Sequence, residues 1–304
     1  MPASGRDVIM STCSLNALFV RTRRHLIVIA LAASLSGLGC GTEIFPVPLA
    51  CPECLDTAES SCSYFELDDG TRIRSQYTPG DPTLPLVIGV AGFGGTYTDV
   101  SIVFPKGTFS TISFSLPGGL CSDLLPAGTT HTIAKCTDVL DKLIEHDQGL
   151  IDQFGRNNVL VAGASFGALV VEDYFVRHPE SEFNAVIVAG QDTPVTGATV
   201  DLIEGYLQFV DFFFPLADNH HLREYLASGR AFDVSQEIVN TQNRWLVIGL
   251  TEDDLAAGTK AMAERLGERA RYAEVPGNHF MILFDGDQIR QLVMDNLPFL
   301  LRQE

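Results

Sequence analysis

Runs typical of buried strands alternate with helical patterns along most of the chain, and this alternation constrains the fold more than any other feature. Six runs are continuous, apolar and rich in β-branched residues, as expected of strands covered on both faces. They span residues 84–95, 109–116, 157–163, 183–190, 244–250 and 270–275. Helical patterns separate most of them, at 132–154, 166–179, 255–268 and 287–302. The alternation predicts an α/β fold, with a mainly parallel sheet and helices on both faces.

An antiparallel hairpin is expected to open this sheet. Two alternating runs within residues 63–80 flank the dipeptide Asp69-Gly70, which is a strong hairpin signal.

The balance of acidic and basic residues narrows the classes of possible partner. The chain has 38 acidic and 20 basic residues, a formal net charge of −18, and no basic cluster beyond residue 25. Such a surface repels phosphate backbones, so we expect no nucleic-acid partner.

The first forty residues resemble an export signal. Arg21, Arg23 and Arg24 precede the apolar run 26–39, which ends at Cys40. This run is shorter than the roughly 20 residues of a membrane-spanning helix. The ending Gly-Leu-Gly-Cys resembles the lipobox of bacterial lipoproteins, in which the cysteine is lipidated, so membrane contact is expected only through that N-terminal lipid. The alternatives are a plain secretory signal cleaved nearby and a start at Met10.

The expected organisation is therefore an export signal at 1–39, a lipid-anchor tether at 40–62 and one catalytic domain at 63–304. Export also makes the cysteines interpretable, because disulfides form in oxidising compartments. After Cys13 and Cys40 are set aside, five remain, enough for at most two internal disulfides whose connectivity stays open. Their spacing matches no zinc site. These five are Cys51, Cys54, Cys62, Cys121 and Cys136.

The strongest chemical signal is the string Gly163-Ala164-Ser165-Phe166-Gly167. It follows a predicted buried strand directly and opens a predicted helix, which is the setting of a nucleophile elbow. A serine on that sharp turn needs a glycine on either side, because neighbouring backbone passes too close for a Cβ atom. Ser165 is therefore the candidate nucleophile.

A serine hydroxyl needs a base, and the base needs an orienting carboxylate. His279 is the candidate base, because it follows the last predicted strand and precedes the last helix, on the edge where open α/β sheets place their ligands. The acid is expected after the preceding strand. Asp253 is preferred there, with Asp254 and Glu252 as alternatives and Asp192, after an earlier strand, as an outside candidate. The order Ser, Asp, His is that of α/β-hydrolases.

From about residue 63 onward the chain resembles an α/β-hydrolase of the lipase and esterase type. The likeness lies in the opening hairpin, the Ala-Gly-Phe-Gly-Gly string at 91–95, the Leu-Pro-Gly-Gly string at 116–119, the elbow and the Pro-Gly-Asn-His-Phe string at 276–280. It implies an oxyanion hole made by the backbone N–H groups of Phe166 and Phe93, although Ala91 replaces the family's usual histidine. It also implies a short helical cap at about 195–243, whose Phe209, Phe212, Phe213 and Phe214 either pack the cap or line an acyl pocket.

The resemblance implies a serine hydrolase that cleaves carboxylic esters through an acyl-enzyme, acting on a small-molecule or acyl substrate without metal or cofactor. Peptide or amide hydrolysis and cofactor-free perhydrolase chemistry are alternatives on the same triad. A third possibility is a surface binding lipoprotein that keeps the fold without the activity. Substrate identity and oligomeric state stay open.

Overall fold

The computed structural model describes residues 60–94, 100–104, 107–119, 121–213, 219–279 and 286–301, without the side chains of 101–102 and 209–213. All of these residues belong to the second of two units into which the chain divides, Thr42–Glu304. The predicted export signal at 1–39 and all but the last residues of the predicted tether lie outside the described residues.

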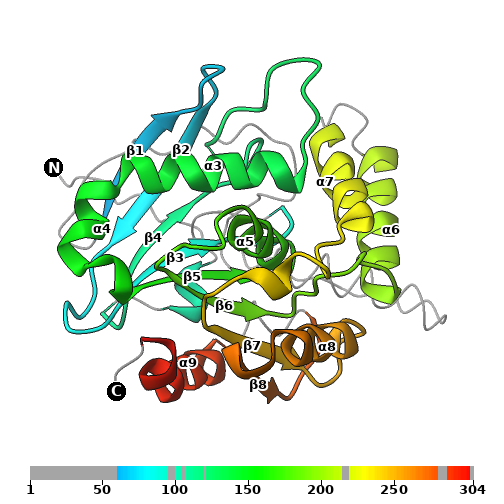
Figure 1. Ribbon diagram of the computed structural model, residues 1–304. Helices are drawn as coiled ribbons and strands as arrows, with labels where there is room; N and C mark the ends of the chain where they lie inside the picture. The colour runs from blue at the N-terminus through cyan, green and yellow to red at the C-terminus, as the bar shows by residue number, and fades with distance from the viewer. Residues whose placement is uncertain are drawn as a thin grey trace, which may run out of the picture. The chain divides into compact units, whose positions relative to one another are not determined.

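An eight-stranded sheet forms the centre of the described part of the chain (Figure 1). Its strand order is β1-β2-β4-β3-β5-β6-β7-β8. The β1–β2 and β2–β4 pairs are antiparallel, whereas every pairing from β4 to β8 is parallel. The predicted opening hairpin and mainly parallel sheet are thus both present. The bounds are β1 Ser61–Glu66, β2 Arg72–Thr78, β3 Leu86–Val90, β4 Ser110–Phe114, β5 Val159–Ala164, β6 Asn184–Val188, β7 Trp245–Leu250 and β8 Ala270–Val275.

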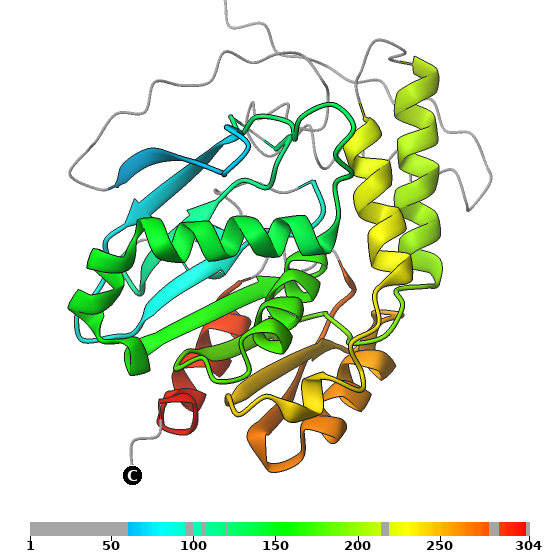
Figure 2. The ribbon, with the colours of Figure 1, turned by 45° about the horizontal axis from the view of Figure 1, so that its top comes forward.

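Helices cover both faces of this sheet (Figures 1 and 2). One hydrophobic cluster joins the sheet to α3, α5 and α8, through residues such as Leu140, Val170 and Met262. A second cluster joins the opposite face to α2 and α9, through Val103 and Val293. The bounds are α2 Val100–Val103, α3 Ile133–His146, α4 Gln148–Phe154, α5 Phe166–Arg177, α6 Ala198–Phe213, α7 His220–Ala231, α8 Ala256–Leu266 and α9 Asp287–Leu300, with short 3-10 turns at Arg156–Asn158, Ile238–Asn240 and Gly267–Arg269.

The central strands are buried on both faces, which explains their unbroken apolar runs. In β5, Val159 and Val161 belong to the first cluster, and Leu160 and Ala162 belong to the second. Successive side chains of a strand point to opposite faces, so both sides of β5 must be apolar. β8 differs, because it lies at the edge of the sheet and most of its residues stay partly exposed.

The single helical pattern predicted at 132–154 is two helices. α3 ends and α4 begins at Asp147, whose backbone leaves the helical conformation at φ −96° and ψ 16°. The N–H of Asp147 still bonds to Leu143 at 2.9 Å, so Asp147 closes the first helix before opening the second. Gly149 follows in the first turn of α4. Glycine has a low helix propensity, so it does not favour one continuous helix across this point.

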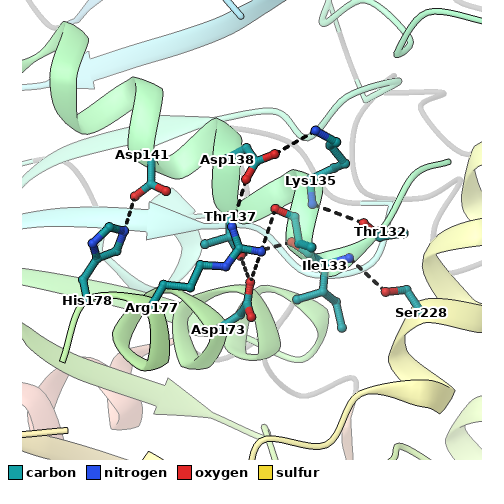
Figure 3. Close-up of polar contacts among 11 residues, drawn as sticks. Thr132, Ile133, Lys135, Thr137, Asp138, Asp141, Asp173, Arg177, His178 and Ser228 are labelled. Atoms are coloured by element: carbon teal, nitrogen blue, oxygen red, sulfur yellow. Dashed lines mark hydrogen bonds and ion pairs between the residues drawn. The ribbon is translucent and has the colours of Figure 1, made fainter. Parts of the chain in front are cut away.

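Polar contacts fix α5 against α3 (Figure 3). The Arg177 guanidinium at the end of α5 donates to Asp138 of α3 at 2.8 Å and pairs with Asp173 at 2.8 Å. At the start of α3, the backbone N–H of Ile133 donates to the hydroxyl of Ser228 in α7 at 2.9 Å. The helix that begins at the elbow is thereby tied to α3, and α3 is tied to α7.

Two helices occupy the region predicted as a cap. α6 and α7 lie side by side in both views, and α7 leads back toward the sheet through residues 232–244 (Figure 2). Arg230 of α7 pairs with Glu204 of α6 at 2.5 Å. The expected role of the four phenylalanines in this region lies outside the described residues. The structure does not describe the side chains of Phe209, Phe212 and Phe213, and it does not describe Phe214.

Candidate active site

Ser165 occupies a sharp turn between β5 and α5. Its backbone has φ 55° and ψ −122°, a conformation that non-glycine residues rarely adopt. The Ser165 N–H donates to Val188 at the end of the neighbouring strand β6, at 2.9 Å. The serine therefore lies at the carboxyl edge of the parallel strands, which is the edge that carries ligands in open α/β sheets.

Close backbone packing explains the two glycines of the elbow. A Cβ atom on Gly163 would lie 2.3 Å from the carbonyl oxygen of Gly167, and one on Gly167 would lie 2.3 Å from that of Val90. Distances below 3.0 Å are essentially not seen for real Cβ atoms. Gly163 and Gly167 thus let α5 start directly against β5 and the end of β3.

The loops after β7 and β8 bring Asp253 and His279 together. These strands are parallel neighbours, with Leu250 opposite Val275. Beyond their ends, the Thr251 N–H donates to Val275 at 3.0 Å, and the Glu252 N–H donates to Gly277 at 2.8 Å. The two loops are therefore tied together just before each turns toward Ser165.

The three predicted side chains form one hydrogen-bonded chain. His279 Nδ1 lies 2.7 Å from Asp253 Oδ2, and His279 Nε2 lies 2.7 Å from Ser165 Oγ. The Asp253 side chain is fully buried, and its other oxygen accepts the Leu255 N–H at 3.0 Å. An ionised carboxylate only accepts hydrogen bonds, so Nδ1 carries the proton and Nε2 presents its lone pair to the serine. This is the arrangement in which an imidazole removes a serine proton.

The structure brings none of the alternative acids to His279. Glu252 is exposed, and Asp254 accepts hydrogen bonds from the backbone N–H of Thr199, at 2.9 Å, and from its hydroxyl. Asp254 thus satisfies donors at the start of α6. Asp192 is buried and paired with Arg265, whose Nε lies 2.8 Å from it. Sequence position made each of these three a possible acid, but in the fold none of them is the carboxylate that bonds to His279.

The two predicted oxyanion donors lie beside Ser165. Phe166 is the first residue of α5, and the first N–H groups of a helix have no acceptor within it. A Cβ atom on Gly92 would lie 3.5 Å from that of Ser165, so the turn carrying Phe93 passes the serine closely. The rings of Phe93 and Phe166 meet edge to face, with centroids 6.3 Å apart.

A cavity of about 40 Å³ opens beside Ser165 and His279, between the sheet and the two cap helices. Tyr225 also lines it, and its hydroxyl donates to the Pro117 carbonyl at 2.8 Å. Most of the other lining side chains are apolar, and Gln191, Thr199 and Arg230 are the polar or charged ones. The apolar ones are Phe93, Phe166, Leu169, Ala189, Val195, Val200, Ile203, Leu226 and Leu255. Such a cavity accepts an apolar group next to the serine.

The carboxyl group of Glu172 is also buried. Glu172 of α5 is fully buried, and neither of its carboxyl oxygens has a hydrogen-bond partner among the described residues. Burial, together with the negative charge of Asp192, raises the pKa of Glu172 well above its usual value, and the nearby Arg265 only partly offsets this. Glu172 therefore keeps its proton at pH values where an exposed glutamate has lost it.

Two of the five cysteines left by the predicted signal are disulfide-bonded, Cys62 and Cys121, whereas Cys136 is free. Burial raises the pKa of the Cys136 thiol to about 12. Cys51 and Cys54 lie outside the described residues.

Within the described ranges, no group of three or more histidine, cysteine, aspartate or glutamate side chains is placed to hold a metal ion. In the same ranges, we find no helix with the length and hydropathy needed to span a bilayer.

Sequence reasoning missed the residues that shape the cavity. Leu169, one turn after Ser165 on α5, follows from helix periodicity once the elbow is known. Tyr225 and Gly229 carry no comparable signal, although a glycine inside a helical stretch is a weak hint that space is needed there.

Comparisons with known proteins agree on the fold. A scan against protein-family profiles finds no match, and no curated protein matches the sequence. Many solved structures are similar. A hydrolase from Pseudomonas aeruginosa PA01 aligns with a TM-score of 0.59 and 17% identity, over 78% of this chain and 98% of the other.

Two esterases are comparably similar. A structure from work on carboxylesterases of the thaumarchaeon Nitrososphaera gargenis has a TM-score of 0.62 and 14% identity, over 80% of this chain and 100% of the other. A thermophilic esterase from Thermogutta terrifontis has a TM-score of 0.62 and 14% identity, over 79% and 99%. With the strand order above, these likenesses show that the chain has the α/β-hydrolase fold.

Proposed function

We propose that this protein is a serine hydrolase that cleaves carboxylic esters through an acyl-enzyme. The observation that carries the proposal is the hydrogen-bonded chain from Asp253 through His279 to Ser165, at 2.7 Å in each step. That chain lies beside a cavity lined mostly by apolar side chains, where an acyl group can be held. The similar structures include carboxylesterases and esterases, which supports the ester class.

The geometry assigns each side chain a role. His279 Nε2 takes the proton of Ser165 as Oγ attacks the carbonyl carbon, and Asp253 stabilises the imidazolium that forms. When the tetrahedral intermediate collapses, the C–O bond to the alcohol breaks and His279 gives the alcohol its proton. Water then attacks the acyl-serine with His279 again as base, which releases the acid and restores Ser165.

Charge that develops on the carbonyl oxygen needs donors already in place. The N–H of Phe166 and that of Phe93 are proposed for this role, because Phe166 follows Ser165 directly and the turn that carries Phe93 passes close to it. Loss of one such donor typically lowers turnover about a hundredfold or more. These steps move only protons and an acyl group.

We further propose that the protein acts outside the cytoplasm, held at the cell envelope by a lipid on Cys40. The basic residues, the short apolar run and the cysteine at its end support this location. The disulfide-bonded state of Cys62 and Cys121 fits an oxidising compartment.

Hydrolysis of activated esters tests the proposed chemistry. The purified protein should hydrolyse p-nitrophenyl acetate and butanoate, and Ser165→Ala or His279→Ala should each lower kcat by about 10⁴-fold or more. Ser235→Ala, which alters a partly exposed serine in the turn after α7, serves as the matched control. If Ser165→Ala keeps its turnover, or if the folded wild-type protein cleaves amides but no ester, the proposal is wrong.

A further inference from the structure

Gly229 occupies an unusual place in the cap. It lies near the end of α7, is buried, and lines the cavity beside Ser165. A glycine within a helix destabilises it by roughly 0.5–1 kcal/mol relative to alanine. A glycine at such a place therefore calls for a physical reason.

The usual reasons for glycine do not apply. Gly229 is not among the glycines with positive φ, so its backbone conformation suits any residue. No close backbone approach excludes a side chain, because a Cβ atom there would meet only Leu169 Cδ1, at an ordinary 3.7 Å. The Gly229 carbonyl accepts the Val195 N–H at 3.1 Å, a bond that every residue type can make. What the glycine leaves is space next to Leu169.

That space belongs to the cavity, and the cavity is small. Its volume is about 40 Å³, a few times the minimum that holds one water molecule. If the ester carbonyl lies at Ser165, only a short acyl chain fits the apolar part. Leu169 follows Ser165 by one turn on α5, and it faces Gly229 across this space.

We propose that Gly229 determines the length of acyl chain that the enzyme accepts, and that its substrates are esters of short, unbranched carboxylic acids, with the butanoyl group close to the upper limit. The inference rests on the proposed function, because it takes the cavity as the acyl site of Ser165. Any side chain at position 229 fills the part of the cavity between α7 and Leu169, so it shortens the accepted chain.

A series of p-nitrophenyl esters from acetate to octanoate tests this. In the wild-type protein, kcat/KM should rise from acetate to butanoate and fall at octanoate. Gly229→Val should lower the ratio of butanoate to acetate kcat/KM about tenfold or more, since one methylene in an apolar pocket is worth about that factor. Gly229→Ala should lower the hexanoate to acetate ratio while raising Tm, because alanine favours the helix.

Two further variants keep the test decisive. Gly205 lies in α6, and a Cβ atom added there would have no neighbour within 4 Å, so Gly205→Ala and Gly205→Val should leave the acyl-chain profile unchanged. Leu169→Ala should shift the profile toward longer chains, even if Gly229→Val does not fold.

The possible failures are distinguishable. If the enzyme hydrolyses the acetate ester but its acyl-chain profile is unchanged by substitutions at both position 229 and position 169, the inference alone is overturned. A folded wild-type protein without turnover of any ester overturns the proposed function and the inference with it.

Discussion

Ser165 has a backbone conformation that a serine keeps only when the surrounding chain holds it. Such conformations cost of order 1–3 kcal/mol each, and they cluster at functional sites. Here the Val188 carbonyl accepts the Ser165 N–H, and the backbone packs closely at Gly163 and Gly167 on either side of the serine. The observed strain is consistent with selection for the position of one hydroxyl group.

Replacing Asp253, the buried carboxylate beside His279, should lower turnover far more than replacing the adjacent Asp254. Asp253→Asn should lower kcat by about 10³–10⁴-fold, because an amide at this position favours the wrong imidazole tautomer. Asp254→Asn is the matched control, since Asp254 bonds to Thr199 and not to His279, and its effect should stay below about tenfold. Steady-state kinetics on an acetate ester measures both. Equal losses in the two variants would contradict the assignment of the acid.

Glu172 should give the protein a characteristic dependence of stability on pH. An unfolded glutamate ionises near pH 4.5, whereas the buried carboxyl keeps its proton to higher pH. At a pH above 4.5 but below the raised pKa of the folded protein, unfolding therefore releases a proton from Glu172. The stability that Glu172 supports is fully present below about pH 4.5, and it falls as pH rises, by up to about 1.4 kcal/mol per unit.

Glu172→Gln should remove this dependence, because an amide does not ionise. Chemical denaturation of both proteins between pH 4 and pH 8 should show the variant gaining stability relative to wild type as pH rises. Parallel curves over the whole range would mean that Glu172 is ionised in the folded state.

At the scale of elements, the elbow depends on the junction of β3, β5 and α5. Gly163→Ala places a methyl group 2.3 Å from the Gly167 carbonyl oxygen, so it should lower the free energy of unfolding by about 1–3 kcal/mol or more. Gly149→Ala, in α4, meets no atom within 4 Å and should raise that free energy by up to about 1 kcal/mol. Thermal unfolding distinguishes the two variants, and a stabilising Gly163→Ala would refute this close packing of β3, β5 and α5.

The central elements were predictable because burial leaves a clear pattern. β5 and β7 contribute side chains to both hydrophobic clusters, so their sequences are continuously apolar. The break at Asp147 was not predicted, since the apolar positions of α3 and α4 continue one helical pattern across it. α6 and α7 were not predicted as separate helices; a helical cap at about 195–243 was expected only through the family likeness.

The candidate site was predictable in part for the same reason. Ser165 and His279 each follow a strand at the carboxyl edge, where motif and position agree. The choice of Asp253 over Asp254 depends on how one loop turns after β7, which three acids in succession do not specify. The cavity, and Gly229 within it, depend on how α6 and α7 pack, and that packing is visible only in the folded chain.

At the scale of the whole molecule, the proposed location rests on a segment outside the described residues. If Cys40 carries a lipid, the full-length protein expressed in a bacterial host should partition into detergent, and Cys40→Ser should move it to the aqueous phase. Cys13→Ser is the matched control and should not change the partition. Detergent partition that persists in Cys40→Ser would refute lipidation at that residue.

The three side chains of the proposed triad come from distant parts of the chain. Ser165 precedes His279 by 114 positions, and Asp253 precedes it by 26. They meet only because β5, β6, β7 and β8 lie in order within one sheet. Activity should therefore be lost together with the sheet, and it belongs to the whole domain.

Reaction with a fluorophosphonate probe, mapped by peptide mass spectrometry, tests the central claim most directly. The account predicts covalent label on Ser165 of the wild-type protein, no label at that position in Ser165→Ala, and strongly slowed labelling in His279→Ala. A well-folded wild-type protein that stays unlabelled, or that is labelled at another serine, would contradict it.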